Sequence, residues 1–130
     1  MKKITIILVL LCVLSAGFFL FSFLSRSPEQ SAVVENNVKI ENGKQIIEIK
    51  VSGGYDPQVS VAKSGLPTVV RFVTNGAFDC SSSIRIPSLG IAQVLPQYGQ
   101  TDIDIGTSTA GTLQGTCSMG MYRFQVQFQP

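Results

Sequence analysis

Short stretches in which apolar and polar residues alternate are the feature that most limits how this chain can fold. The first begins at Ile47, where Ile47, Ile49 and Val51 alternate with Glu48 and Lys50. The same period of two recurs at 59–61, 84–86, 103–105 and 124–128, and a run rich in β-branched residues covers 68–73. Strands this short, separated by Gly, Pro and Asn, are typical of a β-sandwich or barrel. The sequence therefore predicts an all-β domain with antiparallel strands.

The N-terminal segment has a different character. Lys2 and Lys3 precede Ile4–Leu24, a run in which Thr5, Ser15, Gly17 and Ser22 are the exceptions to apolar composition. As a helix this run would be about 31 Å long, close to the thickness of a bilayer's hydrocarbon core. It is longer than the apolar part of a cleaved signal peptide. We expect a single-pass signal anchor in the cell membrane; the alternative is a signal peptide that is removed, which would leave a secreted domain.

These patterns divide the chain into three parts: an N-terminal transmembrane helix at 1–26, a polar linker or loosely held first strand at 27–44, and one β domain at 45–130. Two lysines before the apolar run, against one arginine after it, place the N-terminus in the cytoplasm. The β domain is then extracytoplasmic, where disulfides can form. After the apolar run acidic and basic residues nearly balance, so we expect no nucleic-acid partner.

The chain contains no histidine. Catalytic units that combine Ser or Cys with His cannot be built from it, nor can His-ligated zinc, haem or blue-copper centres. No other pair of residues suggests a general acid and base. We therefore expect a protein that is not an enzyme.

Sulfur-containing residues gather near the C-terminus. Cys117, Met119 and Met121 occur at every second position, and Gly120 allows the backbone to bend between the two methionines. A sandwich can bring the loop that carries Cys80 beside this segment. Thiolate and thioether sulfur are soft ligands that select Cu(I). Cys80, Cys117, Met119 and Met121 are therefore candidate copper ligands.

A disulfide between Cys80 and Cys117 is the alternative interpretation of the same residues. It would make the domain an immunoglobulin-like interaction module held by one covalent bond. The two interpretations do not exclude each other, because a metal site without its metal can oxidise to a disulfide and a reduced pair can bind metal. The residues alone leave both open.

From about Ile47 to Phe128 the sequence resembles bacterial cupredoxin-like copper-binding domains, including those of the EfeO type. The segments that carry the resemblance are 54–67, 75–80, 86–91 and 115–123, and the last contains a Cys-x-Met-x-Met pattern. Phe124 departs from the family, which commonly has glycine there.

The resemblance implies a cupredoxin-like Greek-key β-sandwich with a copper site at one end. It carries Cys80, Cys117, Met119 and Met121 over as the ligands of Cu(I). The implied function is copper handling by a membrane-tethered extracytoplasmic domain, through sequestration or handover to a copper-transport protein. A cupredoxin electron carrier is a further alternative, disfavoured because imidazole normally stabilises Cu(II) and the chain has none.

Overall fold

The computed structural model describes residues 1–4, 6–7 and 37–130. The chain divides into two compact units, Met1–Ser31 and Ala32–Pro130, and every strand of the described residues lies in the second. No helix within the described ranges has the length and apolarity needed to cross a bilayer. Most of the predicted anchor, Ile4–Leu24, falls outside those ranges, as does the linker up to residue 36.

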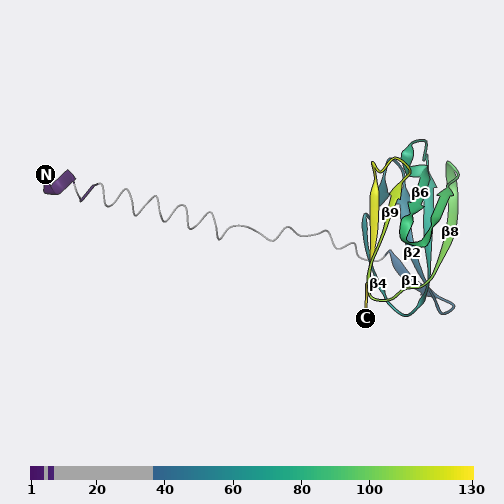
Figure 1. Ribbon diagram of the computed structural model, residues 1–130. Coiled ribbons are helices and arrows are strands. Elements are labelled where there is room, and N and C mark those ends of the chain that lie inside the picture. The colour runs from purple at the N-terminus through teal and green to yellow at the C-terminus, as the bar shows by residue number, and fades with distance from the viewer. Residues whose placement is uncertain (5, 8–36) are drawn as a thin grey trace. The chain divides into compact units, whose positions relative to one another are not determined.

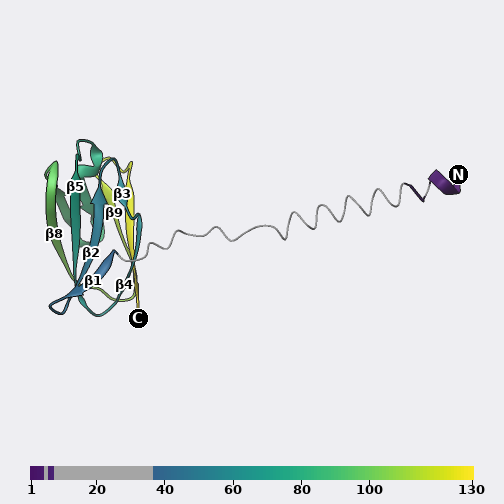
Figure 2. The ribbon, with the colours of Figure 1, turned by 180° about the vertical axis from the view of Figure 1, so that it is seen from behind.

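The first of two sheets contains five strands. Four of them lie in the order β1, β2, β5, β8, and the short β3 also pairs with β2. Its strands are β1 (Val38–Glu41), β2 (Lys44–Val51), β3 (Tyr55–Asp56), β5 (Pro67–Asn75) and β8 (Tyr98–Thr107). Figure 2 shows β2, β5 and β8 side by side on this face of the domain. Asn42 and Gly43, both at positive φ, form the tight turn between β1 and β2. β1 thus lies within the residues that the sequence assigns to a linker or first strand.

The second sheet also has five strands, in the order β4, β10, β9, β6, β7. Its strands are β4 (Val59–Lys63), β6 (Ser83–Ile86), β7 (Ile91–Val94), β9 (Gly111–Cys117) and β10 (Arg123–Gln129). Two short 3₁₀ helices flank β6: η1 (Cys80–Ser82) and η2 (Pro87–Leu89). The sheets pack face to face, which confirms the predicted all-β sandwich (Figure 1).

Apolar residues from both sheets form one core. The fully buried side chains include Ile47, Ile49, Phe72, Ile84 and Phe124. The residues that alternate with Ile47 and Ile49 are less buried, as a half-buried strand requires. The predicted period of two therefore identifies the inward face correctly at β2, β6, β8 and β10. It is wrong at β4, where Ser60 and Ala62 are buried and Val59 and Val61 are half-buried.

The prediction of antiparallel strands is wrong at two pairings. β2 pairs with β5 in parallel, and β4 pairs with β10 in parallel. The chain leaves the first sheet after β3, runs through β4 in the second, and returns to the first as β5. Such a crossover lets β5 lie beside β2 in the same direction. Alternation reports which face of a strand is buried and contains no information on the direction of its neighbour.

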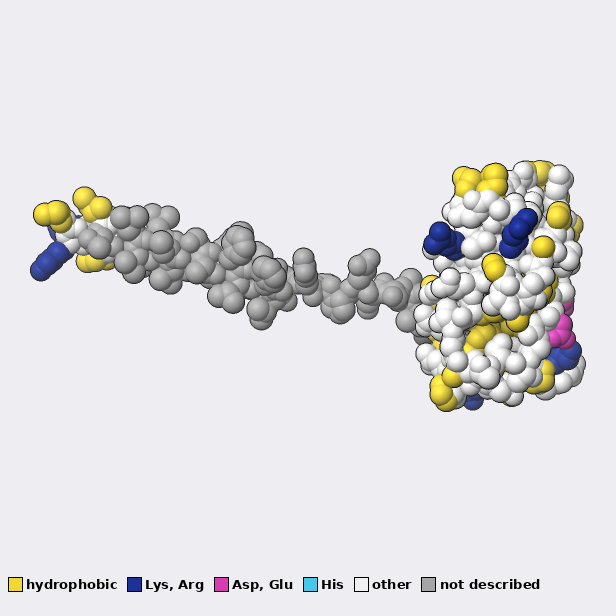
Figure 3. Space-filling model, viewed as in Figure 1, with side chains coloured by type: hydrophobic (Ala, Val, Ile, Leu, Met, Phe, Trp, Pro, Cys, Tyr) yellow, Lys and Arg dark blue, Asp and Glu magenta, His cyan; other side chains and the backbone are white. Residues whose placement is uncertain are grey.

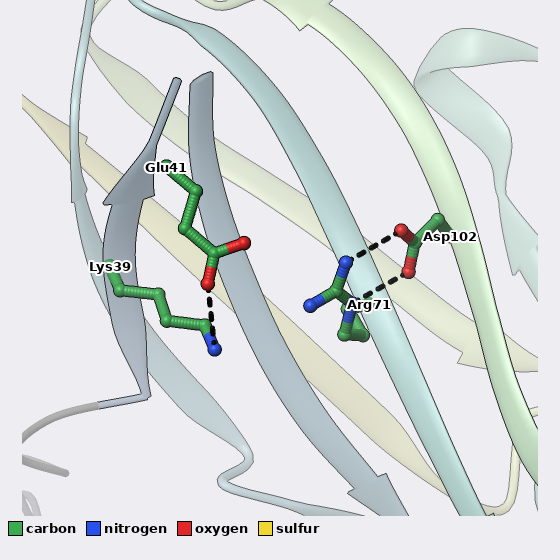
Figure 4. Close-up of polar contacts among 4 residues, drawn as sticks. All are labelled: Lys39, Glu41, Arg71 and Asp102. Atoms are coloured by element: carbon green, nitrogen blue, oxygen red, sulfur yellow. Dashed lines mark hydrogen bonds and ion pairs between the residues drawn. The ribbon is translucent and has the colours of Figure 1, made fainter. Parts of the chain in front are cut away.

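The outer face of the first sheet is polar. Arg71 on β5 donates two hydrogen bonds to the Asp102 carboxylate on β8, at 2.8 and 2.9 Å, and Lys39 pairs with Glu41 (Figure 4). The Asp104 carboxylate accepts a bond from Lys44 at 3.3 Å. Asp102 and Asp104 are thus solvent-facing charges with basic partners.

Candidate metal centre

The fold brings the two domain cysteines together at one end of the sandwich. Cys80 begins η1, in the connection that follows β5, and Cys117 is the last residue of β9. Their Cα atoms are 5.7 Å apart and their sulfur atoms form a disulfide. Of the two interpretations left open by the sequence, the structure contains the disulfide. A site formed by Cys80, Cys117, Met119 and Met121 stays a prediction for the reduced chain.

Cys117 is held by a tight turn between β9 and β10. Its side chain is 1% exposed, and its backbone N–H donates to the Tyr122 carbonyl at 3.0 Å. The Gly120 N–H donates to the Cys117 carbonyl at 2.9 Å, with Gly120 at a φ of 71°. The Tyr122 N–H donates to Cys117 Sγ at 3.4 Å. Such a donor favours the negatively charged form of a sulfur atom, which is the form that binds metal.

Met119 and Met121 lie in the same turn and are 70% and 65% exposed. Methionine in a small sandwich is ordinarily core filling, and these two do not fill the core. Phe78 and Tyr98 are also exposed at this end and pack edge to face, with ring centroids 5.8 Å apart. Figure 3 shows hydrophobic side chains gathered at the end of the domain drawn uppermost. The sulfur atoms of both methionines are thus accessible to solvent beside the cysteine pair.

Asp79 organises the loop that carries Cys80. Its carboxylate accepts the Ser81 N–H at 3.0 Å and a short bond from the Ser81 hydroxyl, and its carbonyl accepts the Ser82 hydroxyl at 2.8 Å. These bonds cap η1. Hydrogen bonds from Ser81, with a smaller contribution from the Tyr122 side chain, hold the pKa of Asp79 below its usual value. Asp79 therefore fixes the start of η1, directly beside Cys80.

Tyr55 supports the same loop from the core. Its hydroxyl donates to the Ser81 carbonyl at 3.1 Å, while its ring packs edge to face against Phe72 and Phe124. Burial raises the pKa of Tyr55 well above its ordinary value, and the Asp79 charge adds to the effect. The Tyr55 hydroxyl therefore stays protonated at neutral pH and keeps its hydrogen bond to the Ser81 carbonyl.

Sequence reasoning placed Asp79 beside Cys80 as a charge that opposes thiolate formation and did not identify it as the cap of η1, and it did not assign Tyr122 or Tyr55 to the site. For Asp79 a signal exists, because an Asp two residues before Ser81 is a common local cap. Tyr122 lies in the same turn as Cys117, five residues further along the chain. Tyr55 comes close to the loop that carries Cys80 through the sandwich topology, which no local pattern encodes. Among the described residues, no three side chains of His, Cys, Asp or Glu type are grouped as a metal site.

Comparison with known proteins places this chain in a family. The profile of the cupredoxin-like domain family matches residues 10–128, so the chain belongs to that family. No curated protein matches the chain.

Solved structures resemble the domain closely in fold. A copper binding protein, solved in solution in its apo form, is 27% identical over 71% of this chain and 94% of its own, with a TM-score of 0.65. The metal binding domain of the Cu(I) exporting P-type ATPase CopA of Streptococcus pneumoniae D39, solved with Cu(I), is 22% identical over 72% and 93%, with a TM-score of 0.64. Auracyanin B is 9% identical over 73% and 96%, with a TM-score of 0.51. The last two likenesses show the fold alone.

Proposed function

We propose that this protein is a membrane-tethered, extracytoplasmic Cu(I)-binding protein that sequesters copper or hands it to a copper-transport protein. The observation that carries the proposal is the meeting of Cys80 and Cys117 at one end of the sandwich, with Met119 and Met121 exposed in the same turn. Copper as the metal is supported by the cupredoxin-like family and by the copper binding protein of similar fold.

The chemistry of these residues suits Cu(I). Two thiolates and one or two thioethers make a soft, three- or four-coordinate sulfur site, and no imidazole is present to favour Cu(II). The Tyr122 N–H directed at Cys117 Sγ supports the thiolate there. In the disulfide form the cysteine sulfurs are bonded to each other, so uptake requires two electrons and two protons to regenerate the thiols.

Handover would proceed by ligand exchange. Cu(I) would leave the site as cysteine or methionine side chains of a partner replace the resident sulfur atoms one at a time. The exposure of Met119 and Met121 supports this route, because a partner can reach those two positions without opening the core.

Copper uptake by the full-length chain tests the proposal. All samples carry Cys12→Ser, so that Cys80 and Cys117 are the sole thiols. After anaerobic reduction and removal of the reductant, Cu(I) is titrated in competition with the chromophoric chelator bathocuproine disulfonate. We expect one equivalent to bind, binding to be lost in Cys80→Ser or Cys117→Ser, and affinity to fall in Met119→Leu or Met121→Leu.

The disulfide favours one competing function, an interaction module in which the Cys80–Cys117 bond is permanent and structural. If the reduced chain takes up no Cu(I), that function replaces the copper proposal. An intense blue absorption band from the oxidised, copper-loaded chain would instead indicate an electron carrier. Digestion by protease added to membrane vesicles of known orientation tests the topology, because an extracytoplasmic domain is cut only in vesicles that expose that face.

A further inference from the structure

The outer face of the second sheet carries two arginines in one row near the cysteine end. Thr116 on β9 pairs with Arg85 on β6 and with Arg123 on β10. All three alternate with buried residues, so their side chains project away from the core. Because neighbouring strands lie about 4.8 Å apart, the Cα atoms of the two arginines are separated by about 10 Å. The row thus presents two positive charges to a single segment of a partner.

No carboxylate of the second sheet balances these charges. Its five strands contain neither Asp nor Glu. Neither Arg85 nor Arg123 forms an ion pair with any residue that the structure describes. Figure 3 shows this face of the domain, with basic side chains and no acidic ones over its upper half. The face is therefore open to carboxylates from another molecule.

A shallow hollow of about 400 Å³ lies on the same face, beside Arg123. Gly120, the residue between Met119 and Met121, also lines it, so the hollow extends from the arginine row to the methionine turn. The other polar side chains of its lining are uncharged: Gln58, Gln114, Thr116 and Gln125. A guanidinium surrounded by amide and hydroxyl donors, without a competing carboxylate, is suited to bind a carboxylate.

Apolar side chains are exposed at the same end of the domain. They are Met119, Met121, Phe78 and Tyr98. Apolar residues bordered by charged and polar ones are typical of a surface that binds another protein. Complementary charges at the border of such a surface orient the partner and speed its approach. A partner whose carboxylates meet the arginines would thus have its adjoining residues at the methionine turn.

We infer that Arg85, Arg123 and the hollow beside Arg123 dock an acidic segment of the protein that accepts copper from this chain. The inference rests on the proposed function, since the partner is the acceptor in copper handover. The arginines bind no copper. They hold the acceptor with its own cysteine or methionine ligands next to Met119 and Met121, the two exposed sulfur positions.

The first test uses no copper. The probe is a fluorescent peptide, Glu-Glu-Met-Gly-Gly-Met-Glu-Glu, compared with the same peptide carrying glutamine in place of glutamate. Its methionines cannot exchange with the disulfide, as cysteines would. Binding to the oxidised full-length Cys12→Ser chain in a non-ionic detergent is measured by fluorescence anisotropy. We expect the acidic peptide to bind about tenfold more tightly at low salt, and added salt to remove this preference by screening the charges.

Substitutions of the arginines locate the docking surface. Arg85→Gln and Arg123→Gln should each weaken binding of the acidic peptide about threefold, on the scale of an exposed charge pair, and the double variant about tenfold. Lysine at both positions keeps the charges and should retain most of the affinity. Lys63→Gln is the matched control, because it removes an exposed positive charge at the opposite end of the same sheet, where Lys63 pairs with Gln129. Thermal unfolding checks that each variant folds.

The second test measures transfer of Cu(I) from the reduced, copper-loaded chain to the same two peptides with cysteine in place of methionine. Cu(I) exchanges its bonds to sulfur atoms of the chain for bonds to two peptide thiolates. The two peptide thiol protons pass through water to the cysteine thiolates of the chain, and copper stays Cu(I). Samples taken at intervals are separated by size, and copper in the peptide fraction is measured. We expect transfer to the acidic peptide to be about tenfold faster, a difference that Arg85→Gln/Arg123→Gln should abolish.

The two tests fail separately. If the reduced wild-type chain takes up no Cu(I), the proposed function is wrong, and the methionine peptides still decide whether this face docks carboxylates. If the wild-type chain shows no preference for the acidic peptide, or if the arginine variants bind it as tightly as the wild type, the docking surface is refuted. An equal loss in Lys63→Gln would refute it too, because net charge alone would then explain the binding.

Discussion

Reduction of the Cys80–Cys117 disulfide should destabilise the domain, and Cu(I) should restore its stability. The disulfide closes a loop across a sequence separation of 37 residues. In the chain-entropy model a loop of this length contributes about 3.8 kcal/mol at 25 °C. For a domain of this size each kcal/mol corresponds to about 4–8 °C in Tm, so reduction should lower Tm by about 15–30 °C.

Copper binding should reverse this loss without re-forming the disulfide. A ligand that binds the folded state alone adds about 2.7 kcal/mol at a free concentration of 100 Kd and about 4.1 kcal/mol at 1,000 Kd. The copper-loaded reduced chain should therefore unfold near the temperature of the oxidised chain, with the reduced copper-free chain well below both.

Calorimetry of the full-length Cys12→Ser chain in three states provides the assay: oxidised, reduced without metal, and reduced with one equivalent of Cu(I). The Cys80→Ser/Cys117→Ser variant is the control, and its Tm should match the reduced copper-free chain and respond to neither reductant nor copper. A reduced chain whose Tm is unchanged by Cu(I) would refute the reasoning about the metal. A Tm that does not change on reduction would refute the reasoning about the disulfide.

Three further predictions concern the framework of the domain. A Cβ atom at Gly115 would lie 2.1–2.8 Å from atoms of the Phe124 ring. Gly115→Ala should therefore lower the free energy of unfolding, measured with urea, by about 1–3 kcal/mol. Adding Phe124→Leu to the same chain should restore part of that free energy. The hydrogen-bonded Arg71 guanidinium holds the pKa of Asp102 below its usual value. Asp102→Asn should therefore lower stability at pH 7, with the difference from wild type vanishing as pH falls below that lowered pKa, and a difference that persists at low pH would contradict this sign. The buried Gln45 amide accepts one hydrogen bond and donates two. Gln45→Ala should therefore lower the free energy of unfolding by more than about 1 kcal/mol in urea unfolding. An unchanged urea midpoint would show that water replaces the amide.

The strands were predictable where one face of the sheet is buried. Ile47 and Ile49 on β2, and Phe124 and Val126 on β10, alternate with polar residues because the sandwich buries one side of each strand. β9 was harder to predict, since Gly111 and Gly115 interrupt its alternation. Strand direction depends on how the chain crosses between sheets, and the two parallel pairs show that such long-range order is not contained in a local period.

Phe124 and Gly115 are complementary across two neighbouring strands. The structure places Phe124 on β10 directly opposite Gly115 on β9. The ring covers the space that a side chain at Gly115 would need, and it packs on Tyr55 and Phe72. The absence of a side chain at Gly115 thus makes room for the Phe124 ring, which belongs to the same aromatic cluster as Tyr55.

The candidate site was predictable in its composition and not in its organisation. The alternation of Cys117, Met119 and Met121, together with the lack of histidine, indicates soft sulfur chemistry without any structure. The hydrogen bond from the Tyr55 hydroxyl to the Ser81 carbonyl, beside Cys80, depends on segments far apart in sequence meeting at one end of the sandwich. Residues that position a site are therefore found after the topology is known.

The distribution of burial at the site argues for exchange of metal rather than for permanent storage. Cys117 is buried and fixed by two hydrogen bonds to Tyr122, whereas Met119 and Met121 lie in solvent. In the proposed copper site, the buried Cys117 thiolate would hold Cu(I), and the exposed thioethers would be the ligands that a partner can displace. A partner would then displace the thioethers first. Thioether sulfur is uncharged, so its bond to Cu(I) would be weaker than that of a thiolate, and neither methionine is part of the core. Within the proposed function, the exposure of Met119 and Met121 therefore favours handover over storage.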